Sequence, residues 1–136
     1  MKVGLVDTNI LIYAAVGAET DQGKWEAAHF LLDQAPHCLS GQNLAEFVST
    51  MIRKLKVPIA ETVKWLEYFE YMEVQPVDRE IVLSGVALSE RFLINYWDAA
   101  LIAAAQRMGV GTLYTEDLNH GQAYGGVTAV NPFLEQ

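Results

Sequence analysis

Short apolar runs alternate with longer segments in which apolar residues recur at helical spacing. Such runs, bounded by turn residues, are typical of β-strands, and we predict strands over 3–6, 37–39, 73–76, 112–115 and 127–130. The helical spacing predicts helices over 22–34, 43–55, 59–72, 78–93 and 97–108, with a further helix that begins at Thr8 or Asn9. Gly109 follows the last of these helices, where a helix end prefers glycine.

This order of elements predicts an α/β fold. Parallel strands need a crossover connection, and a helix is the usual one, so alternating strands and helices indicate a parallel sheet covered on both faces. The chain has 136 residues and no linker rich in Gly, Ser or Pro. We therefore expect residues 1–136 to form a single domain.

Composition narrows the class of protein. Hydrophobic residues make up 51% of the chain and charged residues 19%, which argues against disorder. The central apolar stretch 99–105 is far shorter than the roughly 18 residues of a membrane span, so no membrane partner is expected. Asp7 and Asn9 interrupt the first apolar segment, unlike a secretory signal, and the single Cys38 cannot form an internal disulfide. We expect a cytoplasmic protein.

Charge is distributed unevenly. The net charge of −8 speaks against a broad nucleic-acid-binding surface, which needs Lys and Arg. A basic cluster nevertheless occurs at Arg53, Lys54, Lys56 and Lys64, followed by acidic residues up to position 80. The first three of these are candidates for phosphate contact, although a solvated helix face explains them equally well.

The predicted helix 59–72 carries more aromatic residues than one buried face requires. Surplus aromatic surface of this kind can form a contact with a partner protein or with a second copy of the chain, as in a homodimer. Simple burial of the same residues is the alternative.

Two acids follow predicted strands. Asp7 comes directly after the first strand, and Asp117 comes two residues after the strand that ends at Thr115. The carboxyl ends of parallel strands share one edge of a sheet, so both side chains are expected at the same rim. The alternatives are that Asp7 only caps the following helix and that Asp117 is an ordinary turn residue.

Asp98 and Glu46 lie near the starts of helices. Asp98 precedes a run that is apolar on every side, so its carboxylate is expected near the core, where an ionised acid needs a cation. The alternative is a helix-dipole role beside an Asn95 cap. Glu46 points opposite the apolar face of its own helix, as a solvent-facing residue does, but within the first turns it can still border a crevice.

Several carboxylates on one rim repel one another unless a cation neutralises them. Magnesium and manganese prefer oxygen ligands, so acids are the expected ligands. The three histidines, His29, His37 and His120, show no zinc-site spacing, and we expect them on the surface or on helix faces.

Four segments together resemble a known family. They are Asp7-Thr8-Asn9, Asn43-Leu44-Ala45-Glu46-Phe47, the segment from Trp97-Asp98 to Ala105, and the segment from Leu113 through Thr115-Glu116-Asp117 to Gly121. In this order they resemble a PIN domain, and most of all the VapC-type toxin ribonucleases of toxin–antitoxin pairs. The similarity extends from Met1 to about Pro132.

The resemblance implies a three-layer α/β/α sandwich and an endoribonuclease that depends on Mg²⁺ or Mn²⁺ and leaves a 5′-phosphate and a 3′-hydroxyl. It also implies an RNA substrate and an antitoxin partner. The implied catalytic and metal-binding acids are Asp7, Glu46, Asp98 and Asp117, with Thr115, Thr8 and Asn9 in support. Glu116 competes with Asp117 for the last place, and the Thr-x-Asp spacing favours Asp117.

Two other classes of protein fit parts of the pattern. A receiver-like domain has an acidic pocket too, but it needs a lysine after the last strand, and residues 127–132 offer none. A catalytically inactive PIN-like binding module that acts through a protein partner is the main alternative. Metal binding and RNA cleavage separate that module from a nuclease.

Overall fold

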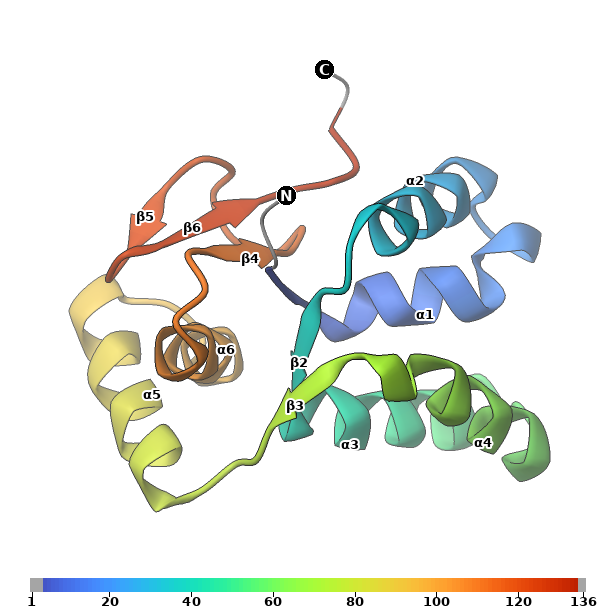
Figure 1. Cartoon of the computed structure of the whole chain (residues 1–136), viewed down its shortest axis with the longest axis horizontal. Coiled ribbons are helices and arrows are strands. Elements are labelled where there is room, and N and C mark those ends of the chain that lie inside the picture. The colour runs from blue at the N-terminus through green and yellow to red at the C-terminus, as the bar shows by residue number, and fades with distance from the viewer. Residues whose placement is uncertain (1–3, 135–136) are drawn as a thin grey trace.

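The computed structural model describes residues 4–134 of the chain. Within that range six strands form one sheet, with helices on both of its faces (Figure 1). The strands are β1 Leu5–Val6, β2 Cys38–Ser40, β3 Glu73–Gln75, β4 Thr112–Tyr114, β5 Ala123–Tyr124 and β6 Val127–Val130. The helices are α1 Thr8–Val16, α2 Gln22–Gln34, α3 Gly41–Ser49, α4 Ile59–Tyr68, α5 Arg79–Phe92 and α6 Tyr96–Met108, with short helical turns η1 Gly17–Glu19, η2 Thr50–Lys54 and η3 Phe69–Tyr71.

The five predicted strands are present. The strand over 127–130 has the predicted ends, and the others have an end moved by one or two residues. Val3, the predicted start of the first strand, lies outside the described residues. The prediction missed β5, which pairs antiparallel with β6. Gly125 and Gly126 connect these strands with φ angles of 59° and 85°, a conformation that a two-residue hairpin turn requires and that glycine adopts without strain. The Gly-Gly pair was the available signal for this hairpin.

The order of strands places one crevice in the sheet. The order is β3-β2-β1-β4-β6-β5, and all neighbours except β5 and β6 are parallel. The chain leaves β1 toward β2 on one side, whereas β4 reaches the other side of β1 only after α5 and α6. Ligands bind at such a change of direction, at the carboxyl ends of the strands.

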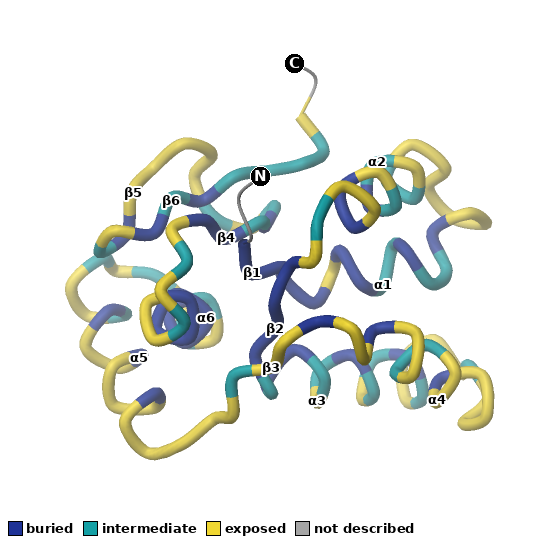
Figure 2. Tube along the Cα trace, in the orientation of Figure 1, coloured by how far each residue is buried: buried dark blue, intermediate teal, exposed yellow. Residues whose placement is uncertain are grey.

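Helices cover both faces of the sheet, so the α/β prediction is confirmed. Leu5 belongs to the apolar cluster that α5 and α6 form on one face. Its neighbour Val6 belongs to the cluster under α1, α2 and α3 on the other face, and both residues are fully buried. Figure 2 shows β1, β2 and β4 as a buried centre between the two groups of helices, whereas β3 at the edge of the sheet is largely exposed. Strands buried on both faces are apolar throughout, which is why the short runs stand out in the sequence.

Helix α6 lies in the core, and its start is fixed against α5. Every residue from Ala99 to Ala105 is buried. Gly85 of α5 faces the start of α6, where a Cβ atom would lie 3.0 Å from Tyr96 Cε1 and 3.1 Å from Ala100 Cα. The Asn95 side chain caps the helix by accepting the Trp97 N–H at 2.7 Å. These contacts set the position of the first turn of α6, which carries Asp98.

Two predicted helices change form along their length. The helix predicted over 43–55 begins at Gly41 and becomes a π-helical turn at 50–54. The helix predicted over 59–72 ends at Tyr68 and continues as a 3₁₀ turn.

In the part of the chain that the structure describes, no helix combines the length and apolarity needed to cross a membrane.

Candidate metal centre

Asp7 joins the end of β1 to the start of α1. Its backbone N–H donates to the Tyr114 carbonyl of β4 at 2.9 Å, which continues the pairing of the two strands. One carboxylate oxygen caps α1 by accepting the Thr8 N–H at 2.6 Å, and the other accepts the Thr115 hydroxyl at 2.8 Å. The residue is 7% exposed. Asp7 therefore caps the helix and also lies in the crevice, so the two interpretations of this residue are compatible.

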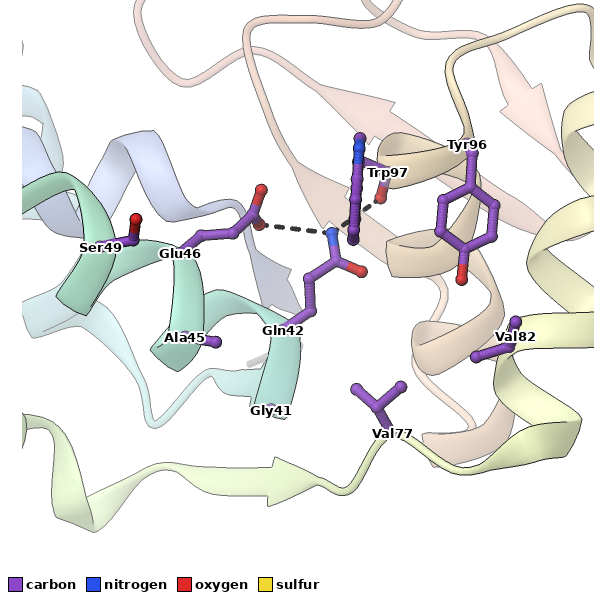
Figure 3. Close-up of a pocket in the computed structure, with 9 residues that line it drawn as sticks. All are labelled: Gly41, Gln42, Ala45, Glu46, Ser49, Val77, Val82, Tyr96 and Trp97. Carbon is purple, nitrogen blue, oxygen red and sulfur yellow. Dashed lines mark hydrogen bonds between the residues drawn. The ribbon is translucent and has the colours of Figure 1, made fainter.

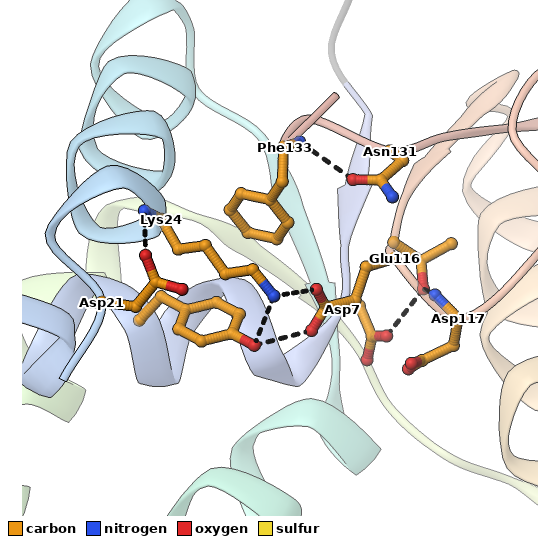
Figure 4. Close-up of polar contacts among 9 residues, drawn as sticks. Asp7, Asp21, Lys24, Glu116, Asp117, Asn131 and Phe133 are labelled. Carbon is orange, nitrogen blue, oxygen red and sulfur yellow. Dashed lines mark hydrogen bonds and ion pairs between the residues drawn. The ribbon is translucent and has the colours of Figure 1, made fainter. Parts of the chain in front are cut away.

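Thr115 sets the course of the loop after β4. Its buried hydroxyl donates to Asp7 and accepts the Asp117 N–H at 3.1 Å. The intervening Glu116 is turned away, because its carboxylate accepts the Tyr13 hydroxyl at 2.8 Å and pairs with Lys24 Nζ at 2.8 Å (Figure 4). Asp117, and not Glu116, faces the other acids, as the Thr-x-Asp spacing favoured.

The fold brings three aspartates from distant segments together. Among the described residues, Asp7, Asp98 and Asp117 each offer a carboxylate oxygen, and these atoms all lie within 4.8 Å of one another. Asp7 is buried, Asp98 half-buried and Asp117 exposed, so the group opens to solvent on one side. The three come from the carboxyl end of β1, the start of α6 and the loop after β4.

Glu46 borders the same cleft without belonging to this group of three. Its Oε1 atom accepts the Thr8 hydroxyl at 3.1 Å and the Gln42 side-chain amide at 3.3 Å. Asn43 in turn donates to the Thr8 hydroxyl at 3.1 Å. The cleft has a volume of about 340 Å³, and Asn9 also lines it. The sequence analysis missed Gln42 and quoted Asn43 only as part of a motif, without a role, although both lie about one turn from Glu46.

The electrostatics of the cleft favour a cation. Burial raises the pKa of Asp7 to about 7. The Thr115 hydrogen bond opposes this shift, and the nearby Asp117 and Asp98 add to it. Burial, with the charges of Asp117 and Glu46, raises the pKa of Asp98 to about 6. Among the described residues that line the cleft there is no Lys, Arg or His. An all-oxygen set of crowded acids is the donor set that suits a hard divalent cation, so the residues fit Mg²⁺ or Mn²⁺.

Other candidates of the sequence analysis lie elsewhere. Arg53, Lys54 and Lys56 are exposed and line a separate cavity of about 690 Å³, which meets the acidic cleft at Thr50. His37 is buried, contrary to expectation: its Nδ1 accepts the Gly4 N–H at 3.3 Å, and its Nε2 lies 3.0 Å from the Leu31 carbonyl. It is a structural residue that connects Gly4, just before β1, to the last turn of α2.

Comparisons with solved structures find the same fold in toxin–antitoxin proteins. A chain of a toxin–antitoxin complex from Klebsiella pneumoniae is 20% identical with a TM-score of 0.70, and the match covers 95% of this chain and 97% of that chain. A chain of DNA-bound VapBC from Salmonella typhimurium is 17% identical with a TM-score of 0.67, over 95% and 97% of the two chains. VapC20 of Mycobacterium tuberculosis, described as a sarcin-ricin loop cleaving toxin, is 19% identical with a TM-score of 0.62, over 84% and 89%.

The family is identified by comparison of the sequence with protein-family models. No curated protein matches the chain significantly. The PIN domain family matches residues 4–125, which is most of the chain and includes all four acids of the cleft. The structural matches, at their low identities, agree with this in fold. The chain belongs to the PIN domain family.

Proposed function

We propose that residues 1–136 form a single-domain, metal-dependent endoribonuclease and that it is the toxin of a toxin–antitoxin pair. The main support is the convergence of Asp7, Asp98 and Asp117, whose carboxylate oxygens lie within 4.8 Å of one another in a PIN domain. Three acids without a cationic neighbour are tolerated best with a divalent ion. The choice of RNA follows the family and the activity described for VapC20.

In this proposal Asp7, Asp98 and Asp117 hold one or two Mg²⁺ or Mn²⁺ ions, and Glu46 completes the set of catalytic acids. A bound ion of this kind lowers the pKa of water and stabilises negative charge on phosphate oxygens. Thr115 keeps the Asp7 carboxylate in place by donating to it, and it fixes the backbone of Asp117 by accepting its N–H.

Thr8 and Asn9 support the site from the first turn of α1. The Thr8 hydroxyl donates to Glu46, which restrains that carboxylate at the edge of the cleft. Asn9 is exposed at the cleft, where its amide can meet the RNA backbone. Arg53, Lys54 and Lys56 are proposed to contact phosphates away from the cleaved bond, because their cavity adjoins the cleft at Thr50 and carries the opposite charge.

The test is cleavage of a mixed pool of transfer, messenger and ribosomal RNA with Mg²⁺, with Mn²⁺ and with chelator. We expect cleavage that the chelator abolishes, ends that carry a 5′-phosphate, and loss of activity in Asp98→Asn. Asp33→Asn, which changes an exposed aspartate of α2, is the matched control and keeps activity. Cleavage that persists in chelator or in Asp98→Asn would contradict the proposal.

The antitoxin partner is proposed to contact the exposed apolar residues of α4. Ile59 and Val63, one turn apart, are 66% and 43% exposed, and Tyr68, on another side of the helix, is 48% exposed. A cavity of about 420 Å³ between α2 and α4 is lined by Trp65 and Tyr68. A homodimer is the other occupant of such a surface, and light scattering of the purified chain tests it.

The same surface supports the second candidate, an inactive PIN-like module that acts only through its protein partner. Expression in a bacterial cytoplasm separates the two candidates. A nuclease toxin arrests growth, and Asp98→Asn relieves the arrest. A binding module leaves growth and RNA unchanged, with and without that substitution.

A further inference from the structure

An apolar cavity of about 630 Å³ adjoins the acidic cleft (Figure 3). It lies between the start of α3, the β3–α5 connection and the start of α6. Its apolar walls are Ala45, Val77, Val82 and the rings of Tyr96 and Trp97. The Trp97 side chain is 57% exposed, although large aromatic residues usually bury most of their surface.

The cavity and the acidic cleft share a wall. The shared residues are Gln42, Glu46 and Trp97. A molecule in the cavity is therefore separated from the proposed reaction site by a single layer of side chains. Ser49 lines both this cavity and the basic one that holds Arg53. Helix α3 and the turn that follows it therefore border an apolar, an acidic and a basic cavity in close succession.

Gln42 presents an acceptor to the apolar cavity. Its side-chain nitrogen donates to the Trp97 carbonyl at 3.0 Å and to Glu46 Oε1 at 3.3 Å. Both partners only accept hydrogen bonds, so the orientation of the amide is determined and the nitrogen faces them. The oxygen consequently points into the cavity toward Tyr96, as Figure 3 shows. This is a fixed acceptor on a residue that is 8% exposed.

The charges of the residues that line the cavity determine which part of a nucleotide can bind there. Among the described residues that line it, none is Lys or Arg, and Glu46 stands at its edge. A phosphate would be repelled there and would gain no ion pair. A nucleobase is uncharged, stacks on aromatic rings, and in adenine, cytosine and guanine carries an amino group that can donate to an acceptor.

We propose that this cavity is the subsite for one unpaired nucleobase of the RNA, next to the cleaved bond. The base stacks on Trp97 and donates its amino group to Gln42 Oε1, while flanking phosphates lie over the basic cavity. This inference rests on the proposed function. It assigns Trp97 and Gln42 as residues that determine substrate specificity.

Binding is tested separately from cleavage. The chain has three tryptophans, so a Trp25→Phe/Trp65→Phe variant leaves Trp97 as the only one. Single-stranded RNA decamers of mixed sequence are added in Ca²⁺, and an abasic ribose-phosphate decamer is the control probe. We expect the base-bearing decamers to quench Trp97 fluorescence and the abasic one to leave it unchanged. Equal quenching by both probes, or by neither, would overturn the proposal.

Cleavage of a decamer pool with random bases tests the position of the subsite. Val82→Trp fills the cavity from α5 without touching the acidic cleft, and Val86→Trp, one turn further along the exposed side of α5, is the matched control. We expect a base preference at one position beside the cut. Val82→Trp and Trp97→Ala reduce kcat/KM about ten- to hundred-fold and flatten that preference, and Trp97→Phe restores it in part.

The outcomes separate this inference from the proposed function. If the wild-type chain cleaves no RNA, the proposed function fails, and the fluorescence experiment still decides whether a base enters the cavity. If Val82→Trp and Val86→Trp cleave RNA equally well with the same base preference, the cavity serves another occupant, such as a protein segment, and the inference fails. If Trp97→Ala loses Mn²⁺-induced thermal stabilisation, its effect arises at the metal centre, which also contradicts the inference.

Discussion

Replacing Asp7 by asparagine should stabilise the metal-free protein at alkaline pH while it abolishes cleavage. Asparagine has nearly the same shape and keeps an oxygen that can accept the Thr8 N–H, so the cap of α1 survives. It cannot ionise, however. The substitution therefore removes two costs: the burial of a negative charge at position 7, and the repulsion between that charge and Asp98 and Asp117.

The magnitude follows from the pKa of Asp7. Burial and neighbouring acids raise that pKa from 3.8 to about 7. Because the folded state binds this proton more tightly than the unfolded state, the contribution of Asp7 to stability is greatest below about pH 4 and is lost as the pH rises through about 7. A shift of roughly three pKa units corresponds to about 4 kcal/mol at most. Asp98, whose pKa is raised to about 6, acts in the same direction.

Urea denaturation in chelator at pH 5 and pH 8 measures this effect. We expect the wild-type free energy of unfolding to fall between the two pH values, and the Asp7→Asn variant to exceed the wild type at pH 8 by about 2–4 kcal/mol. At pH 5 the difference should be much smaller. Adding Mn²⁺ at pH 8 should stabilise the wild type far more than the variant, because the variant lacks one anionic ligand.

The exposed Asp33→Asn substitution is the control, and it should change neither stability nor its pH dependence. An Asp7→Asn variant that is less stable than the wild type at pH 8 in chelator would contradict this expectation. Equal stability of the wild type at both pH values would contradict it too, because the crowded acids would then not repel one another measurably.

Other substitutions test the supports of the site. Lys24→Met should loosen Glu116, which then keeps only the Tyr13 hydrogen bond and can compete with Asp117. The Mn²⁺ affinity measured by calorimetry should change several-fold while far-UV circular dichroism stays the same, and an unchanged affinity would show that the ion pair has no part in positioning. Gly85→Val should lower the free energy of unfolding by about 1–3 kcal/mol through collision with α6, whereas the exposed neighbour Ser84→Val should have little effect. Phe47→Ala, at a fully buried ring, should cost about 3–5 kcal/mol in urea denaturation, and a loss below 1 kcal/mol would contradict the packing.

Much of the fold and part of the site could be predicted without coordinates. Strands buried on both faces read as short apolar runs, and crossover helices read as periodic segments, so local composition was enough for the α/β class. The rule that parallel strands end at one edge placed Asp7 and Asp117 at the same rim, and a carboxylate at the entrance of an apolar helix singled out Asp98. Pattern alone left a capping or turn role open for each of them, and the resemblance to the PIN family was needed to group them as candidates.

Tertiary structure alone decided which side chains meet. A helical wheel describes Glu46 relative to its own helix, and only the approach of Thr8 from α1 turned that solvent-facing position into a wall of the cleft. The choice between Glu116 and Asp117 depended on Tyr13 and Lys24, which hold Glu116 away from the cleft and are both far away in sequence. The apolar cavity likewise joins α3, α5 and α6. The pattern of residues along a segment indicates its secondary structure and its buried face. Contacts between distant segments arise from packing, which no local pattern encodes.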